Sequence, residues 1–263
     1  MINHTFVVLA YKDSPYLKEC LDSLKNQTVK SDIYISTSTP SVYIREIAEL
    51  FGIKVYVSRL PSSSMNDCNF AFRQAKTKYV TLAHQDDLYL PQYAETCIAA
   101  ANNYNDTLIC FTNYSEFTGG ADKQVSALLK VKRLMLWIFM PLKKHMQSRF
   151  WKMKLLAFGN PISAPTIMYN LEKMPGYQFN SSLIYNLDWE EWYKLSKEEG
   201  RFIYLPEILV KRRMHSESAT TRGLKNNLSY AEDLKMFKLF WPTVFAKLIV
   251  RFYSTRSKSN STD

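Results

Sequence analysis

The chain has 263 residues, 46% of them hydrophobic and 22% charged, which is enough for one large domain with a sizeable core. Its net charge of +10 favours an anionic partner: a nucleotide, a nucleic acid or an acidic membrane surface. No run of about 18 apolar residues occurs, and the amino terminus runs directly into a strand-like segment. We therefore expect a cytoplasmic protein without signal peptide or transmembrane helix. Its four cysteines have no zinc-binding spacing, and we expect them to be reduced and mostly buried.

Strand and helix signals alternate through the first 115 residues. The predicted strands are Thr5–Ala10, Asp32–Ser36, Ile53–Val57, Lys78–Ala83 and Thr107–Asn113. The predicted helices are one that begins with Ser14 as N-cap and Pro15 as first helical residue, then Val42–Phe51, Met65–Ala75 and Pro91–Asn102. Repeated βα units predict an α/β fold with a Rossmann-like, mostly parallel sheet that helices cover on both faces.

The pattern changes after a break at Thr118–Gly120. Basic and aromatic residues are interleaved over Lys130–Leu156, which predicts either a helical hairpin with a solvated basic face or a surface that rests on anionic lipid. The remaining predictions are a strand at Ser163–Tyr169, a helix at Asp188–Glu199, a strand at Phe202–Leu205, a polar loop at Lys211–Arg222, helix over Asn227–Tyr253 and a frayed tail at Ser254–Asp263. We expect one domain over residues 1–222, with a basic helical insertion at 118–160, and a C-terminal helical extension over 223–263.

A cluster of metal-ligand residue types follows the apolar strand Lys78–Ala83. The next four residues are His84-Gln85-Asp86-Asp87, and carboxylates at the end of a buried strand are costly unless a cation accompanies them. A divalent ion that holds a diphosphate would satisfy them; alternatively, the aspartates only cap the next helix, which Pro91 could open. Ligands of parallel sheets bind at the carboxyl ends of strands, where Tyr11-Lys12-Asp13 and Ser36-Thr37-Ser38 also fall.

Two later clusters add candidate groups. Asp188 begins an amphipathic helix with Trp189 and Trp192 on its apolar side, and it is either a functional carboxylate or an N-cap. Arg213-Met214-His215 offers a phosphate-binding guanidinium and an imidazole ligand. The plainer alternatives are surface charge for Arg212 and Arg213 and a hydrogen-bonded loop residue for His215.

Four motifs in this order resemble glycosyltransferase family 2, whose members have the GT-A fold. The resemblance covers about 220 residues, from Phe6 to Thr221. The first motif is the segment Phe6–Thr28, and the second is His84-Gln85-Asp86-Asp87 in the place of Asp-x-Asp-Asp, with Asn69, Ala75 and Tyr79-Val80 matching the positions that lead to it. The third is Asp188 in a Glu-Asp motif whose Glu is replaced by Leu187, and the fourth is the closing Arg213-x-His215. The segment Ser36-Thr37-Ser38-Thr39 departs from the Asp-Asp-Gly-Ser of the family, which leaves the identity of the nucleotide base open.

The resemblance implies a metal-dependent, inverting transfer of a sugar from a nucleotide-diphospho-sugar, with UDP as the expected nucleotide, to an acceptor hydroxyl. The residues implied for donor binding are Ala10, Tyr11, Asp13, Ser36, Thr37, Asn69, His84, Asp86 and Arg213. The ligands implied for Mn²⁺ or Mg²⁺ are Asp86, Asp87 and His215, and Asp188 would be the catalytic base. The expected partners are the donor and a glycan or lipid-linked acceptor of cell-surface polysaccharide synthesis, and not nucleic acid.

Other functions fit less of the sequence. A sugar-1-phosphate nucleotidyltransferase needs a glycine-rich loop, and Tyr11–Pro15 contains no glycine. A nucleic-acid-binding module explains the charge but not carboxylates at several strand and helix ends. The alternative that the chain is a catalytically inactive relative, which serves as a partner subunit, stays open.

The C-terminal segments 235–242 and 245–253 are basic and aromatic and would lie on a membrane surface as a peripheral contact. In the competing account, Trp241, Phe245 and Ile249 pack on the domain and the lysines are only solvated.

Overall fold

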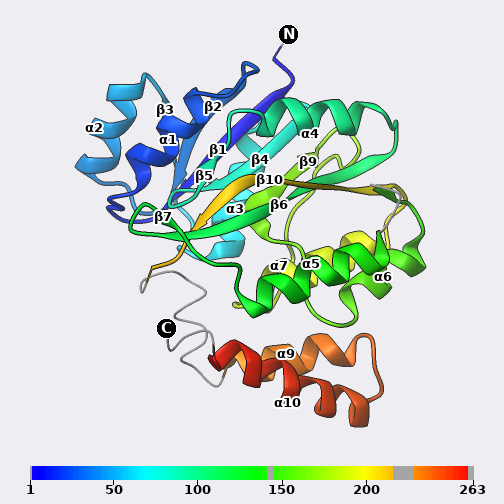
Figure 1. Ribbon diagram of the computed structural model, residues 1–263. Coiled ribbons are helices and arrows are strands. Elements are labelled where there is room, and N and C mark those ends of the chain that lie inside the picture. The colour runs from blue at the N-terminus through cyan, green and yellow to red at the C-terminus, as the bar shows by residue number, and fades with distance from the viewer. Residues whose placement is uncertain (1, 141–144, 216–227, 260–263) are drawn as a thin grey trace. The chain divides into compact units, whose positions relative to one another are not determined.

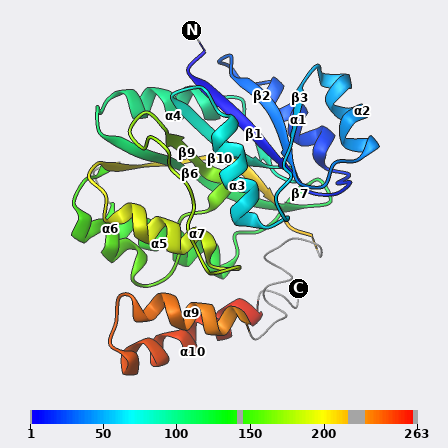
Figure 2. The same cartoon turned by 180° about the vertical axis from the view of Figure 1, so that it is seen from behind.

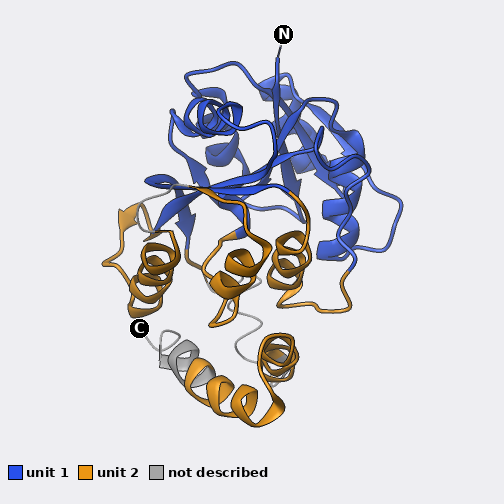
Figure 3. Ribbon diagram, turned by 90° about the vertical axis from the view of Figure 1, so that its right-hand side faces the viewer, with its two compact units in different colours: residues 1–115, 164–180, 200–213 blue, residues 116–163, 181–199, 214–263 orange. Residues whose placement is uncertain are grey.

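The computed structural model describes residues 2–140, 145–215 and 228–259. The chain divides into two compact units, which Figure 3 distinguishes by colour. Unit 1 consists of residues 1–115, 164–180 and 200–213, and unit 2 of residues 116–163, 181–199 and 214–263. The domain boundary expected after residue 222 lies outside the described residues.

Unit 1 is built on a sheet whose strand order is β3-β2-β1-β4-β9-β6-β10-β5 (Figure 1). The strands are β1 (His4–Ala10), β2 (Asp32–Thr37), β3 (Lys54–Val57), β4 (Tyr79–His84), β5 (Leu88–Tyr89), β6 (Thr107–Thr118), β9 (Ile167–Asn170) and β10 (Arg201–Arg213). Strands β3, β2, β1 and β4 are parallel, as the repeated βα units predict. Beyond them the sheet is mixed, because β9 runs antiparallel to β4 and β6, and β5 antiparallel to β10. The predicted α/β fold is confirmed.

Helices cover both faces of the unit 1 sheet. They are α1 (Leu17–Lys25), α2 (Val42–Phe51), α3 (Ser64–Gln74) and α4 (Tyr93–Asn102). On one face the Phe6 ring of β1 lies 5.9 Å from the Tyr93 ring of α4. On the other face, Tyr34 stands beside Val7 in the β1–β2 register and donates a hydrogen bond to the Ala71 carbonyl of α3, which Figure 2 shows in front of the strands. All four cysteines are buried free thiols, as expected.

Unit 2 is mainly helical around two buried tryptophans of α7. Its elements are β7 (Ala121–Asp122), α5 (Ala127–Phe139), β8 (His145–Met146), α6 (Arg149–Leu156), α7 (Leu187–Ser196), α9 (Leu228–Lys238) and α10 (Thr243–Ser259). Trp189 and Trp192 are fully buried, as the amphipathic pattern predicts. The Trp189 indole donates to the Leu156 carbonyl at 3.1 Å and packs edge-on against Phe237 of α9. Within the described residues, no helix is both long and apolar enough to cross a membrane.

Two predicted boundaries are wrong for identifiable reasons. Helix α1 begins at Leu17, with Tyr16 as N-cap, because the Ser14 hydroxyl accepts a hydrogen bond from the Tyr16 amide in a turn that precedes the helix. The strand predicted at Ser163–Tyr169 starts as a 3₁₀ turn at Ala164–Thr166, since Pro165 has no N–H to donate to a sheet.

The end of β10 also corrects a prediction. Lys211–Arg213 belong to this strand rather than to a polar loop, because Val210 and Lys211 pair with β5. The predicted strand Phe202–Leu205 is part of the same long strand. The rest of the predicted loop, residues 216–222, lies outside the described residues.

The basic segment after the Thr118–Gly120 break contains α5 and α6, so it is helical as predicted. The break itself is the turn between β6 and β7. Lys143 and Lys144 lie outside the described residues. The C-terminal region forms α9 and α10, and α10 continues to Ser259, which corrects the prediction of a frayed tail from residue 254.

Gly200→Ala should lower the free energy of unfolding by roughly 3 kcal/mol. A Cβ at Gly200 (φ +125°) would lie 2.5 Å from the Asp106 carbonyl oxygen and 2.7 Å from Leu108 Cγ. Gly52→Ala is the matched control, because Gly52 also has a positive φ, +60°, but no atom lies within 4 Å of its Cβ position. The free energy of unfolding of the control, measured by urea unfolding, should fall by only about 1 kcal/mol. Equal losses would contradict the steric explanation.

Candidate functional site

The carboxyl end of β4 brings three metal-ligand side chains together. His84 is the last residue of β4, and Asp86 and Asp87 follow in the turn before β5. One ligand atom from each of these three residues lies within 4.8 Å of the others. His84, which the sequence assigned to donor binding, therefore completes this group.

The electrostatics of this group favour a cation. Burial, followed by the charge of Asp86, raises the pKa of Asp87 to about 8, although Arg212 and Arg213 oppose the shift. Burial lowers the pKa of His84, so its imidazole is neutral and keeps a lone pair for a metal. Two carboxylates and a neutral imidazole form a donor set that suits Mn²⁺, and Mg²⁺ through the oxygens. The residues present therefore fit a divalent ion.

Arg213 organises the turn that carries the two aspartates. Its backbone N–H donates to Asp87 Oδ1 at 2.9 Å, and its Nε donates to the Asp86 carbonyl at 3.0 Å. The guanidinium also pairs with Glu19 and lies 4.3 Å from the centre of the Tyr16 ring. Arg213 is 8% exposed, so the alternative of a surface charge is wrong for this residue.

The aspartates do not cap the following helix. Helix α4 begins at Tyr93 with Gln92 as N-cap, and the side chain that accepts an N–H in its first turn is that of Gln27, which bonds Ala94 at 3.0 Å. This finding rules out the plainer account of Asp86 and Asp87.

The end of β1 lies next to β4 in the sheet, and the end of β2 lies next to β1. Tyr11 exchanges two hydrogen bonds with the Gln85 side chain, through its N–H at 3.1 Å and its carbonyl at 2.9 Å. Lys12 adopts a left-handed conformation, φ +56°, and its N–H donates to the Thr39 hydroxyl at 2.7 Å. A positive φ at a residue with a side chain is uncommon and concentrates at functional sites. The hydroxyl-rich end of β2 thus holds the β1 loop in place.

Four of the other predicted donor-binding residues of unit 1 lie at or just after these strand ends, and the fifth, Asn69, lies on α3. Ala10, Ser36 and Thr37 are buried, with Ala10 beside Thr37 in the β1–β2 register. Asp13 is exposed and accepts a hydrogen bond from Ser41 at 2.6 Å. Asn69 on α3 is buried, and its side-chain amide makes two hydrogen bonds with the backbone of residue 179.

Asp188 lies in the first turn of α7, in unit 2. The helix begins one residue earlier, at Leu187, with Asn186 as N-cap, so the alternative that Asp188 is the N-cap is wrong. Asp188 Oδ1 accepts the N–H of Trp189 at 2.7 Å, and its Oδ2 accepts from Asn160 at 3.1 Å. His215 also belongs to unit 2. The roles of Asp188 and His215 at the metal group stay predictions.

Glu232 on α9 is a residue that the sequence analysis missed. Its buried carboxylate accepts hydrogen bonds from the backbone N–H groups of Ile184, Tyr185 and Asn186, at 2.8 to 2.9 Å. The neighbouring Asp233 accepts from the Asn186 side chain, and burial raises the pKa of Asp233 to about 6. These bonds span more than 45 residues, so no local pattern predicts them. They hold the segment that leads into α7 and therefore Asp188.

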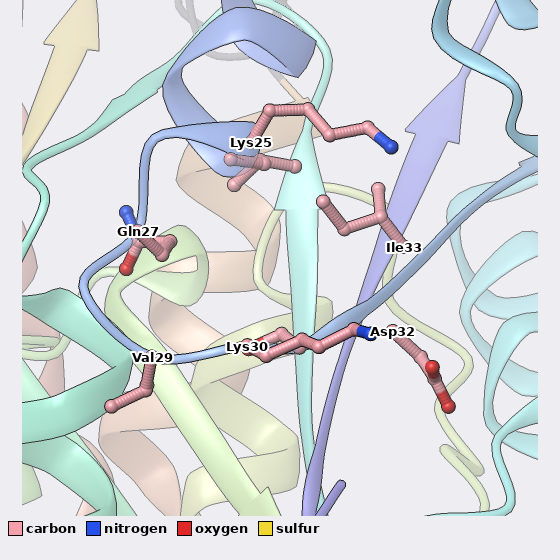
Figure 4. Close-up of a pocket in the computed structure, with 8 residues that line it drawn as sticks. Lys25, Gln27, Val29, Lys30, Asp32 and Ile33 are labelled. Atoms are coloured by element: carbon pink, nitrogen blue, oxygen red, sulfur yellow. The ribbon is translucent and has the colours of Figure 1, made fainter.

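A pocket of about 420 Å³ lies elsewhere in unit 1 (Figure 4). Its lining comes from the α1–β2 connection and includes Gln27, Lys30 and Asp32. Asp32 is the first residue of β2, whereas Ser36 and Thr37 end that strand. The pocket thus lies at the amino ends of the strands, and we assign it no part in the site.

The model of the family described as "Glycosyl transferase family 2" matches residues 5–162, more than half of the chain. The chain belongs to glycosyltransferase family 2. This glycosyltransferase is 24% identical over 239 residues to an uncharacterized glycosyltransferase of Rickettsia prowazekii, covering 88% of this chain and 69% of the relative. It is 22% identical over 269 residues to an uncharacterized glycosyltransferase of Methanocaldococcus jannaschii, covering 94% of this chain and 87% of the relative.

Solved structures with a similar fold include TarS 1–349 of S. aureus, with a TM-score of 0.61 and 14% identity over 98% of this chain and 72% of that one. The mannosyltransferase PcManGT of Pyrobaculum calidifontis, in complex with GDP-Man and Mn²⁺, has a TM-score of 0.63 and 12% identity over 98% and 73%. At such identities the likeness shows the fold alone, which is that of the GT-A glycosyltransferases.

Glu232→Gln should lower the free energy of unfolding by roughly 2 kcal/mol, because the amide has one acceptor oxygen for three buried N–H donors and points its own NH₂ at them. Glu199→Gln is the control, since Glu199 in the same unit makes an exposed ion pair with Arg149 that contributes little. Urea unfolding gives the free energies, and hydrogen exchange at the amides of residues 184–186 should accelerate only in Glu232→Gln. Unchanged exchange there would contradict the assigned contacts.

Proposed function

We propose that this glycosyltransferase moves a sugar from a nucleotide-diphospho-sugar to an acceptor hydroxyl with inversion at the anomeric carbon. The observation that carries the proposal is the group of His84, Asp86 and Asp87 at the carboxyl end of β4. Two proteins of similar fold support it, because their structures contain UDP-GlcNAc and GDP-Man with Mn²⁺, respectively. The acceptor would be a glycan or a lipid-linked sugar, as in the synthesis of cell-surface polysaccharides.

The metal group would hold Mn²⁺ or Mg²⁺. Asp86 and Asp87 supply oxygen ligands and His84 a nitrogen, with His215 as a further candidate. A divalent cation bound there would neutralise the charge that develops on the leaving diphosphate. The chain's own contribution is to keep Asp87 in place through the Arg213 N–H and to keep the His84 imidazole neutral.

Asp188 would act as the general base. The acceptor oxygen attacks the anomeric carbon, the bond from that carbon to the diphosphate oxygen breaks, and the acceptor proton passes to the Asp188 carboxylate. A single displacement of this kind inverts the configuration. Asn160 and the Trp189 N–H orient the carboxylate.

UDP-sugars are the first donors to test. The hydroxyls of Ser36 and Thr37, which replace aspartates of the family motif, can still accept and donate hydrogen bonds to a nucleoside. The experiment measures sugar transfer in the presence of an acceptor, and hydrolysis of the donor in its absence, for a panel of UDP- and GDP-sugars with added Mn²⁺. Donor binding without turnover of any donor would instead favour an inactive partner subunit.

Asp86→Ala should abolish Mn²⁺-dependent donor binding and lower turnover by roughly 100-fold or more, because a carboxylate ligand is lost. Asp22→Ala, at an exposed position of α1, is the control and should change neither quantity. Calorimetric titration of the donor, with and without a chelator, gives the affinities, and thermal unfolding checks that both variants fold. Full metal-dependent binding by Asp86→Ala would remove Asp86 from the site.

Asp188→Asn should lower kcat by about 100-fold or more while donor affinity persists, since the amide keeps the shape but cannot accept a proton at neutral pH. Glu190→Gln is the control because Glu190 lies in the same helix turn and pairs with Lys194. Steady-state kinetics separate kcat from KM. Loss of activity in the control alone would reassign the base to Glu190.

A further inference from the structure

Helix α10 has one face that packs within unit 2 and another that is exposed and apolar. Ala246 and Val250 are fully buried. Phe245, which the competing account of the sequence placed in contact with the domain, is 57% exposed, so that account is wrong for this residue. The other large apolar side chains exposed on the helix are Val244 (78%), Leu248 (53%) and Phe252 (68%).

These residues share one side of the helix. At 3.6 residues per turn, Val244, Phe245, Leu248 and Phe252 fall within an arc of about 100°. Lys247 and Arg251 are exposed and follow at one edge of that arc, and Ala246 and Val250 lie beyond them. We call Val244, Phe245, Lys247, Leu248, Arg251 and Phe252 the α10 outer face. It is an apolar stripe with a cationic border.

The charge on α10 itself has one sign, and the two acidic residues of α9, the helix that packs against it, are buried: Glu232 and Asp233. The sequence of α10, Thr243–Ser259, contains no acidic residue. The sequences of α5 and α6 in the same unit also contain lysine or arginine and no acid, and they expose Trp137 and Trp151. An apolar stripe with a cationic border complements the interface of a bilayer with anionic headgroups. There the apolar residues can contact the acyl chains while the cations contact the headgroups.

We infer that the α10 outer face docks the protein onto an anionic lipid surface. The helix lies in the headgroup region, with Phe245, Leu248 and Phe252 directed into the acyl boundary and Lys247 and Arg251 beside the lipid phosphates. A second copy of the chain is a poorer occupant, because a two-fold contact would bring the Lys247 and Arg251 side chains of both copies together in a protein of net charge +10. The inference does not depend on the donor or on the chemistry of transfer.

Co-sedimentation of the full chain with vesicles tests the inference. We expect the protein to pellet with vesicles of equal parts phosphatidylglycerol and phosphatidylcholine and to stay in solution with phosphatidylcholine alone. Because exposed charges are screened by salt, binding should weaken at least tenfold between about 50 mM and about 500 mM NaCl.

Matched variants identify the face. Leu248→Ser/Phe252→Ser should weaken binding at least tenfold, whereas Val42→Ser/Leu50→Ser, which removes equally exposed apolar side chains from α2 in unit 1, should not. Lys247→Glu/Arg251→Glu should weaken binding further than Lys18→Glu/Lys25→Glu on α1. All four pairs change exposed residues, so thermal unfolding should show folded proteins throughout.

Three results would overturn the inference. The first is no binding of the wild-type chain to the anionic vesicles at low salt, and the second is equal binding by the α10 and α2 serine variants. The third is a dimer in analytical ultracentrifugation, without vesicles, that Leu248→Ser/Phe252→Ser dissociates. That result would assign the face to self-association.

Discussion

A buried carboxylate at the end of β4 is the constraint on which the site of unit 1 depends. Asp87 is 2% exposed and stands beside Asp86, an arrangement that is unfavourable without compensating donors or cations. Arg213 supplies part of the compensation from β10, through its backbone N–H, which donates to Asp87, and through the charge of its guanidinium. Burial and the charge of Asp86 still raise the pKa of Asp87 despite these contacts. A divalent cation at this group, as we propose, would stabilise the ionised carboxylates further.

In unit 2, backbone N–H groups stabilise another buried carboxylate. The Glu232 carboxylate is buried and receives three N–H donors from the segment before α7. Burial of Trp189 and Trp192 fixes the rest of that helix. Asp188 therefore stands on an element held at its start by hydrogen bonds and along its length by aromatic packing. The role of base that we propose for Asp188 requires this kind of support, because small displacements of a catalytic group are costly to the rate.

Local signals predicted the elements whose ends are capped by nearby residues. Helix Val42–Phe51 was predicted with its correct bounds, since Ser41 caps its start and Gly52 ends it in a left-handed conformation. Local signals failed where a competing contact intervened. Ser14 forms a turn instead of a cap, and the strand that ends at Arg213 is extended by its pairing with β5.

The sequence by itself determined the α/β class, the parallel strands that repeated βα units require, and the motif His84-Gln85-Asp86-Asp87 at a strand end. These depend on periodicity and on neighbours within a few residues, which a single chain displays directly. Only the tertiary structure decided that Arg213 holds the turn of the aspartates and that Glu232 holds the start of α7. The Glu232 contact joins residues that are 46 apart in the sequence, and the Arg213 contact joins residues that are 127 apart. Such pairs form only when the packing of the whole unit makes burial of a charge favourable, and no local pattern encodes that balance.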